Sequence, residues 1–84
     1  MRPIHELFSR IRWDEEFGAA DFTVGYFDRV AQQIVCVPFH QLLFDAQDHF
    51  AFRLVDEEGA LHTIPYHRVK ELYRNGVLIW YREH

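Results

Sequence analysis

The chain has 84 residues, of which 49% are hydrophobic and 17% aromatic, and its formal net charge is −4. The length predicts a single small domain over residues 1–84, and the apolar content excludes an intrinsically disordered segment. The acidic balance argues against a general nucleic-acid coat protein, and no apolar run approaches the roughly 20 residues that a membrane-spanning helix needs.

The N-terminus and the cysteine content predict the cellular compartment. The first residues, MRPIHELF, lack the apolar stretch and the small-residue cleavage site of a secretory signal peptide. Cys36 is the only cysteine and cannot form an internal disulfide, which is typical of a reducing compartment. We therefore expect a cytoplasmic protein that does not associate with membranes.

The first predicted element is a helix over residues 3–12. Pro3 suits the first turn of a helix, where its missing N–H costs nothing. The apolar residues that follow have the i, i+3, i+4, i+7 spacing of one buried stripe: Ile4, Leu7, Phe8 and Ile11. Residues 13–21, WDEEFGAAD, break this period and contain Gly18, and they predict an acidic loop that begins at Trp13.

Two strands are predicted next. Residues 22–29, FTVGYFDR, alternate, and three of them share one face: Phe22, Val24 and Tyr26. Gly25 inside this strand indicates a bulge or a close approach by another group. Residues 32–39, QQIVCVPF, predict the second strand, which ends at Pro38 and buries Cys36 as a small hydrophobe.

The middle of the chain predicts a short helical turn and a second hairpin. Residues 40–47 are compatible with one helical turn. Residues 49–56 predict a strand in which three apolar side chains alternate: Phe50, Phe52 and Leu54. Residues 57–59 read as a turn, after which residues 60–64 return as an antiparallel strand.

Residues 69–82 have two interpretations. The Asn75-Gly76 pair is a strong signal for a β-hairpin with a two-residue loop. Such a loop would pair Tyr73 with Leu78 and Glu71 with Trp80. In the alternative, Val69, Leu72 and Tyr73 belong to a helical stripe that ends at the same Asn-Gly pair.

Together these elements predict an α+β fold. An N-terminal helix would pack on an antiparallel sheet, or on a partly closed barrel, of five to six strands with local connections. Neither a repeat nor a linker interrupts the pattern.

Most kinds of chemical site lack support in the sequence. The six histidines show no paired short spacing of the kind that zinc sites use, and there is one cysteine, so we predict no metal site. No Gly-rich phosphate loop is present. We assign neither catalytic residues nor a cofactor.

Two polar clusters remain, each at the end of a predicted strand. They are Tyr26, Asp28 and Arg29 in GYFDR, and His67 and Arg68 in PYHR. A guanidinium presents a planar fork that matches two phosphate oxygens, and an imidazole adds a further donor. The segment from residue 65 onward has more Lys and Arg than Asp and Glu, while the rest of the chain is acidic. In the alternative interpretation, Asp28 and Arg29 form a turn and Arg68 pairs with Glu71 or another acid.

A resemblance to a known family bears on this choice. The ordered segments RIRWDEEF, DFTVGYFDR, IVCVPF and IPYHRVKELYRNGVLIWYR resemble the RNA cyclic group end recognition domain family, a small domain formerly of unknown function. The resemblance covers about residues 11–82. It implies binding of RNA ends that carry a 2′,3′-cyclic or related phosphate, and an RNA-processing enzyme as a partner.

The family's motifs fall on ten positions of this chain. They are Trp13, Asp14, Gly25, Tyr26, Asp28, Arg29, Pro65, His67, Arg68 and Trp80. We interpret the two tryptophans, with Asp14, Gly25 and Pro65, as structural anchors rather than as binding residues.

The resulting hypothesis is an RNA-binding module that acts in RNA processing or repair. Arg29, His67 and Arg68 would donate to a terminal phosphate at the 3′ end of an RNA. Tyr26 would contact the last base or ribose, and Asp28 would orient Arg29 or accept from a hydroxyl. Two alternatives stay open: a phosphoesterase with His67 as acid or base, and an adaptor for an RNA-processing enzyme.

Overall fold

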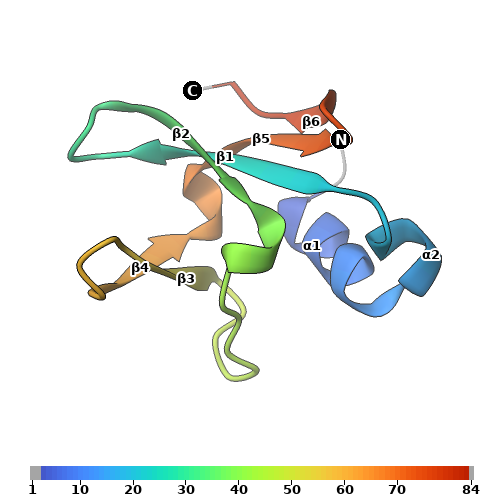
Figure 1. Cartoon of the computed structure of the whole chain (residues 1–84), viewed down its shortest axis with the longest axis horizontal. Coiled ribbons are helices and arrows are strands. Elements are labelled where there is room, and N and C mark those ends of the chain that lie inside the picture. Colours follow the sequence, from blue (N-terminus) through green and yellow to red (C-terminus); the bar gives the residue numbers. More distant parts are fainter. Residues whose placement is uncertain (1–2, 84) are drawn as a thin grey trace.

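The structure is a computed structural model, and it describes residues 3–83 (Figure 1). It has the predicted α+β fold. The strands are β1 (Phe22–Asp28), β2 (Gln33–Pro38), β3 (Ala51–Val55), β4 (Leu61–Pro65), β5 (Val69–Arg74) and β6 (Val77–Tyr81). They form a four-stranded antiparallel sheet in the order β2-β1-β5-β6 and a two-stranded antiparallel sheet, β3-β4. The sheets are separate, so the alternative of a partly closed barrel is not observed.

The helices are short. They are α1 (Ile4–Trp13), α2 (Glu15–Gly18) and two 3-10 turns, η1 (Phe39–Gln41) and η2 (Tyr66–Arg68). The predicted stripe of α1 is buried, as its spacing requires. Within residues 3–83, no helix has both the length and the apolar character needed to cross a bilayer.

The acidic segment after α1 differs from its prediction. We expected a loop over residues 13–21, but the segment contains α2. The carboxylate of Asp14 accepts hydrogen bonds from the backbone N–H groups of Glu16 and Phe17, both at 3.1 Å. A side chain that accepts from the first free N–H groups of a helix stabilises even a single helical turn. The four residues of α2 show no apolar period, so the sequence pattern did not predict this helix.

The last two strands form the hairpin that Asn75-Gly76 predicted, so the helical alternative is wrong. Tyr73 pairs with Leu78 as expected. A register irregularity between Leu72 and Tyr73 then shifts the pairing, so Glu71 faces Tyr81 and not Trp80. The shift places Trp80 opposite Leu72, and both side chains are buried.

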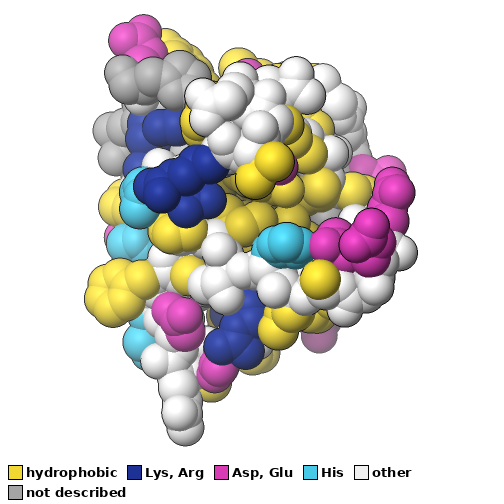
Figure 2. Space-filling view, turned by 90° about the vertical axis from the view of Figure 1, so that its left-hand side faces the viewer, with side chains coloured by type: hydrophobic (Ala, Val, Ile, Leu, Met, Phe, Trp, Pro, Cys, Tyr) yellow, Lys and Arg dark blue, Asp and Glu magenta, His cyan; other side chains and the backbone are white. Residues whose placement is uncertain are grey.

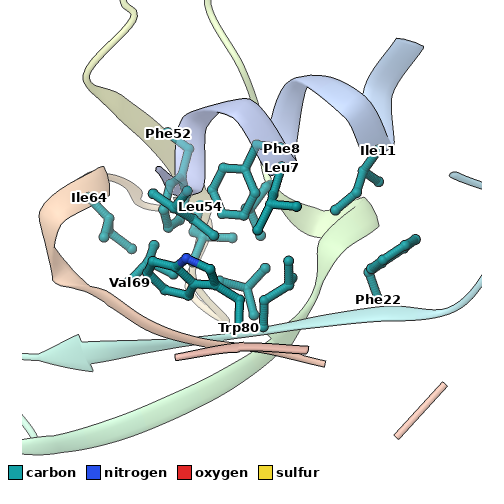
Figure 3. Close-up of a cluster of buried hydrophobic side chains, with 13 residues drawn as sticks. Leu7, Phe8, Ile11, Phe22, Phe52, Leu54, Ile64, Val69 and Trp80 are labelled. Atoms are coloured by element: carbon teal, nitrogen blue, oxygen red, sulfur yellow. The ribbon is translucent and has the colours of Figure 1, made fainter. Parts of the chain in front are cut away.

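The core lies on one face of the four-stranded sheet. Figure 1 shows α1 and the β3-β4 hairpin beneath this face. Phe8 of α1 is 1% exposed, and its ring contacts four other aromatic rings edge-on: Phe39, Phe44, Phe52 and Tyr66. Figure 3 shows side chains of α1 meeting those of the strands: Leu7, Phe8 and Ile11 on one side, and Phe52, Leu54, Val69 and Trp80 on the other.

Two side chains that we expected to be buried are exposed. Phe50 is 81% exposed because it precedes β3, in a bend where its N–H donates to the Asp48 carboxylate. Cys36 is exposed because β2 is an edge strand and the sheet face opposite the core carries no helix (Figure 1).

Candidate functional site

The free ends of the β1-β2 and β3-β4 hairpins extend past α1 on the same side of the molecule (Figure 1). Between them lies a cavity of about 680 Å³, called here the hairpin cavity. Its apolar lining includes Val35, Val37, Leu54 and Ile64. Its polar lining includes Tyr26, Asp28, Arg29, Asp56, Glu57, His62, Thr63 and Arg68. Figure 2 shows this side, with hydrophobic side chains in the middle and basic, acidic and histidine side chains around them.

Arg68 is held in place by the chain around it. Pro65 ends β4 in an extended conformation, with φ −62° and ψ 144°, and η2 follows at once. Arg68 is the last residue of η2 and is half-buried. Its Nε is enclosed and has no hydrogen-bond partner within residues 3–83.

Arg68 also forms no ion pair within that part of the chain, so the alternative of pairing with Glu71 is not observed. Without an ion pair, the positive charge of Arg68 is not compensated by a neighbouring carboxylate. The unpartnered Nε–H adds to this cost, since a buried donor without a partner costs about 1–3 kcal/mol.

Arg29 and Asp28 stand at the end of β1 and have different tasks. The carboxylate of Asp28 accepts hydrogen bonds from the N–H groups of Val30 at 2.8 Å and Ala31 at 3.2 Å. It thus holds the β1-β2 loop, as the alternative interpretation stated, and forms no ion pair with Arg29. The guanidinium of Arg29 is exposed and has no acidic partner among the described residues.

Tyr26 joins the cavity to the core. Its ring meets Phe52 edge-on, with 6.2 Å between centroids. Burial, and then the negative charge of Asp28, raises the pKa of the Tyr26 hydroxyl. This group therefore stays protonated at neutral pH and can donate a hydrogen bond.

Asp56 and His62 form a pair on the β3-β4 side of the cavity that sequence reasoning missed. His62 Nε2 lies 2.6 Å from Asp56 Oδ2. The other oxygen of Asp56 accepts from the N–H groups of Glu58 and Ala60. The hydrogen bond to His62, followed by that to Ala60, lowers the pKa of Asp56. The predicted turn at residues 57–59 could have indicated this pair, because such a turn brings residues 56 and 62 to the same end of one hairpin.

His67 lies elsewhere. It lines a second hollow of about 770 Å³, called here the aromatic hollow, together with Phe50 and Arg82. The structure thus brings Tyr26, Asp28, Arg29 and Arg68 to one cavity and leaves His67 outside its lining. Within residues 3–83, no three His, Cys, Asp or Glu side chains gather in a way that could hold a metal ion.

The residues interpreted as anchors divide into two groups. Trp80 is 6% exposed and belongs to the core. A Cβ on Gly25 would lie 2.9 Å from the Glu71 carboxylate and 3.2 Å from the Ile34 side chain, in accord with the predicted close approach. Trp13 is 74% exposed and does not anchor the core, because α1 turns this position away from the sheet. The guanidinium of Arg12 lies over its ring, 5.2 Å from the centroid.

Comparison with known proteins adds to this geometry. No solved structure matches the chain. A sequence model named for the recognition of RNA ends matches residues 1–82, and so extends the resemblance to the start of α1. The chain belongs to the family of the MJ1316 RNA cyclic group end recognition domain.

Proposed function

We propose that this protein binds RNA ends that carry a 2′,3′-cyclic phosphate or a 3′-phosphate, and that the terminal phosphate occupies the hairpin cavity. The observation that carries the proposal is the half-buried Arg68, whose Nε has no hydrogen-bond acceptor and whose guanidinium has no carboxylate partner within residues 3–83. An anion beside this guanidinium would supply the missing charge. Arg29 would contribute a second, more exposed donor from the β1-β2 hairpin.

The remaining lining explains why one terminal phosphate fits better than a long stretch of backbone. Asp28, Asp56 and Glu57 also line the cavity, so its charge is mixed. The carboxylates of Asp28 and Asp56 are already engaged with backbone N–H groups of their own turns. Their remaining acceptor capacity suits a ribose hydroxyl, and the hydroxyl of Tyr26 suits a base or ribose oxygen.

The expected affinity follows from the small number of charged contacts. A hydrogen bond to a charged group contributes about 1.5–3 kcal/mol. Two guanidinium contacts, less the cost of ordering the RNA end, support binding in roughly the micromolar range. With one terminal phosphate neutralised on a single strand, the logarithm of the affinity should fall with the logarithm of salt at a slope of about −0.7.

The test compares three RNAs of one sequence that end in a 2′,3′-cyclic phosphate, a 3′-phosphate or a free hydroxyl. We expect both phosphorylated ends to bind at least tenfold more tightly than the hydroxyl end. Arg68→Ala should remove this difference, and Arg74→Ala, which removes an equal charge from the exposed end of β5, should preserve it. Equal affinity of the wild-type protein for all three ends would overturn the proposal.

A second candidate function is hydrolysis of the cyclic phosphate, and the Asp56-His62 pair favours it. An imidazole held by a carboxylate is the usual arrangement of a general base. His62 would take a proton from water, whose oxygen attacks phosphorus, while the bond from phosphorus to the 2′ oxygen breaks and that oxygen takes a proton from a solvent water molecule. Conversion of the cyclic end to a 3′-phosphate that is lost in His62→Gln would support this candidate. Binding with the cyclic end left intact would rule it out.

The apolar surface of one edge strand supports a proposal for the expected RNA-processing partner. The edge strand β6 exposes four large apolar side chains: Val77, Leu78, Ile79 and Tyr81. We propose that such an enzyme contacts this strand. Co-purification of the two proteins that survives ribonuclease treatment and is lost in Ile79→Lys would support the contact. Loss of co-purification on ribonuclease treatment alone would contradict it.

A further inference from the structure

The aromatic hollow lies on the other side of η2 from the hairpin cavity and has a different chemistry. Tyr66 and His67 line the hollow, and Arg68, the next residue, lines the cavity. A polymeric ligand that extends from the hairpin cavity across η2 would therefore enter the aromatic hollow. The hollow is the surface that the next units of such a ligand would contact.

The charge of the hollow is positive. The residues that line it include Arg82 and three histidines, His5, His49 and His67, and none of the described lining residues is Asp or Glu. The guanidinium of Arg82 lies over the Trp80 ring, 5.1 Å from its centroid, and its Nη1 donates to the carbonyl oxygen of His67 at 3.5 Å. These contacts hold Arg82 at η2 and leave donors for an anion.

Phe50 gives this hollow an exposed aromatic face. Its side chain is 81% exposed, and its ring contacts no other aromatic ring within residues 3–83. The backbone of Phe50 is nevertheless fixed at both polar groups. Its N–H donates to Asp48 at 3.0 Å, and its carbonyl oxygen accepts from the Tyr66 N–H at 2.8 Å. A large ring presented to solvent from a fixed backbone, in the same hollow as the guanidinium of Arg82, is the arrangement that binds single-stranded nucleic acid.

We propose that the aromatic hollow binds the nucleotides that precede the RNA end. One base stacks on Phe50, and the phosphate that joins it to the terminal nucleotide lies against His67 and Arg82. This inference rests on the proposed function, which supplies the occupant of the cavity. It gives the ligand a minimum length of two to three nucleotides and requires the RNA to be single-stranded at its end.

The experiment is a length series with one kind of end. The ligands are a nucleoside 2′,3′-cyclic monophosphate, and a dinucleotide and a trinucleotide with the same cyclic end. We expect the trinucleotide to bind about tenfold more tightly than the mononucleotide, which is the usual effect of one stacked base. Phe50→Ala should remove most of this gain and leave the affinity for the mononucleotide unchanged.

The control variant is Tyr81→Ala, which removes an exposed aromatic side chain from β6, outside the lining of the hollow. It should leave the whole series unchanged. Arg68→Ala should weaken all three ligands by the same factor. Folding is not at risk in Phe50→Ala, because the ring belongs to no part of the core.

The outcomes separate this inference from the proposed function. Equal affinity at all lengths, or an equal loss for the mononucleotide in Phe50→Ala, overturns the inference while end recognition stands. A gain with length that needs Phe50, combined with equal affinity for cyclic-phosphate and hydroxyl ends, supports the hollow as a binding site and overturns end recognition. Binding of apolar peptides that competes with the trinucleotide and needs Phe50 would assign the hollow to a protein partner instead.

Discussion

His67 and Arg68 are neighbours in the chain, yet they line different hollows on the two sides of η2. The separation follows from the turn itself, because successive residues of a 3-10 helix point about a third of a turn apart. One short turn therefore gives one residue to each of two adjoining sites. In the proposed complex, Arg68 contacts the terminal phosphate and His67 the phosphate before it.

This arrangement predicts different ligand dependence for the two residues. Arg68→Ala should weaken binding of a nucleoside 2′,3′-cyclic monophosphate at least tenfold, and His67→Ala should leave it unchanged. With the trinucleotide both variants should lose affinity. Calorimetric titration of each variant with both ligands measures the difference, and an equal loss for the mononucleotide would contradict the division.

Replacement of Arg68 by lysine tests the geometry of the contact rather than its charge. A lysine keeps the positive charge but lacks the planar fork that matches two phosphate oxygens. We therefore expect Arg68→Lys to bind the cyclic end more weakly than the wild type and more tightly than Arg68→Ala. Wild-type affinity in Arg68→Lys would show that charge alone is recognised.

Phe8 and Phe50 should differ sharply in their effect on stability. Phe8 is 1% exposed and contacts four aromatic rings, whereas Phe50 is 81% exposed. Removal of a buried phenylalanine side chain costs about 3–5 kcal/mol, a large part of the stability of a small domain. Urea unfolding should show this loss in Phe8→Ala and almost none in Phe50→Ala. Similar losses in the two variants would contradict the core described here.

Gly25 should resist substitution because strand β5 approaches it closely. A Cβ at this position would meet the Glu71 side chain at 2.9 Å and the Ile34 side chain at 3.2 Å. We expect Gly25→Ala to lower the free energy of unfolding by about 1–2 kcal/mol, as overpacking does. Glu71→Ala in the same chain should restore part of the loss, because it removes the nearer contact. No recovery in the double variant would place the strain elsewhere.

The hydrogen bond between Asp56 and His62 predicts a pH dependence of stability. The hydrogen bonds from His62 and from the Ala60 N–H lower the pKa of Asp56 from its ordinary value of 3.8. The ionised carboxylate therefore stabilises the fold above that pH. This contribution is lost as the pH falls through the lower folded-state pKa. NMR titration should therefore give a midpoint below 3.8 for Asp56, which rises in His62→Ala. An unchanged midpoint would show that His62 has no part in the shift.

Local sequence patterns predicted the structure correctly where a residue pair determines a turn or where an apolar period determines the buried face of an element. Asn75-Gly76 predicted the last hairpin, and the alternation of Phe22, Val24 and Tyr26 predicted the inner face of β1. These features depend on residues within a few positions of each other. They are therefore readable without the fold.

The features that could not be predicted depend on contacts between distant segments. The register shift at Leu72 and the exposure of Trp13 are set by packing of the whole sheet and helix. The assignment of His67 and Arg68 to different hollows depends on where η2 sits between the two hairpins. No local pattern contains that information, so only the folded structure shows that the two residues do not share one site.

The most direct measurement of the central claim is the Nε–H resonance of Arg68 in an RNA titration. We predict that this resonance shifts and saturates together with binding of an RNA that ends in a 2′,3′-cyclic phosphate, and that an RNA of the same sequence with a hydroxyl end leaves it in place. The Arg74 resonance should not move with either RNA. An Arg68 resonance that stays fixed while the cyclic-phosphate RNA binds would contradict the account.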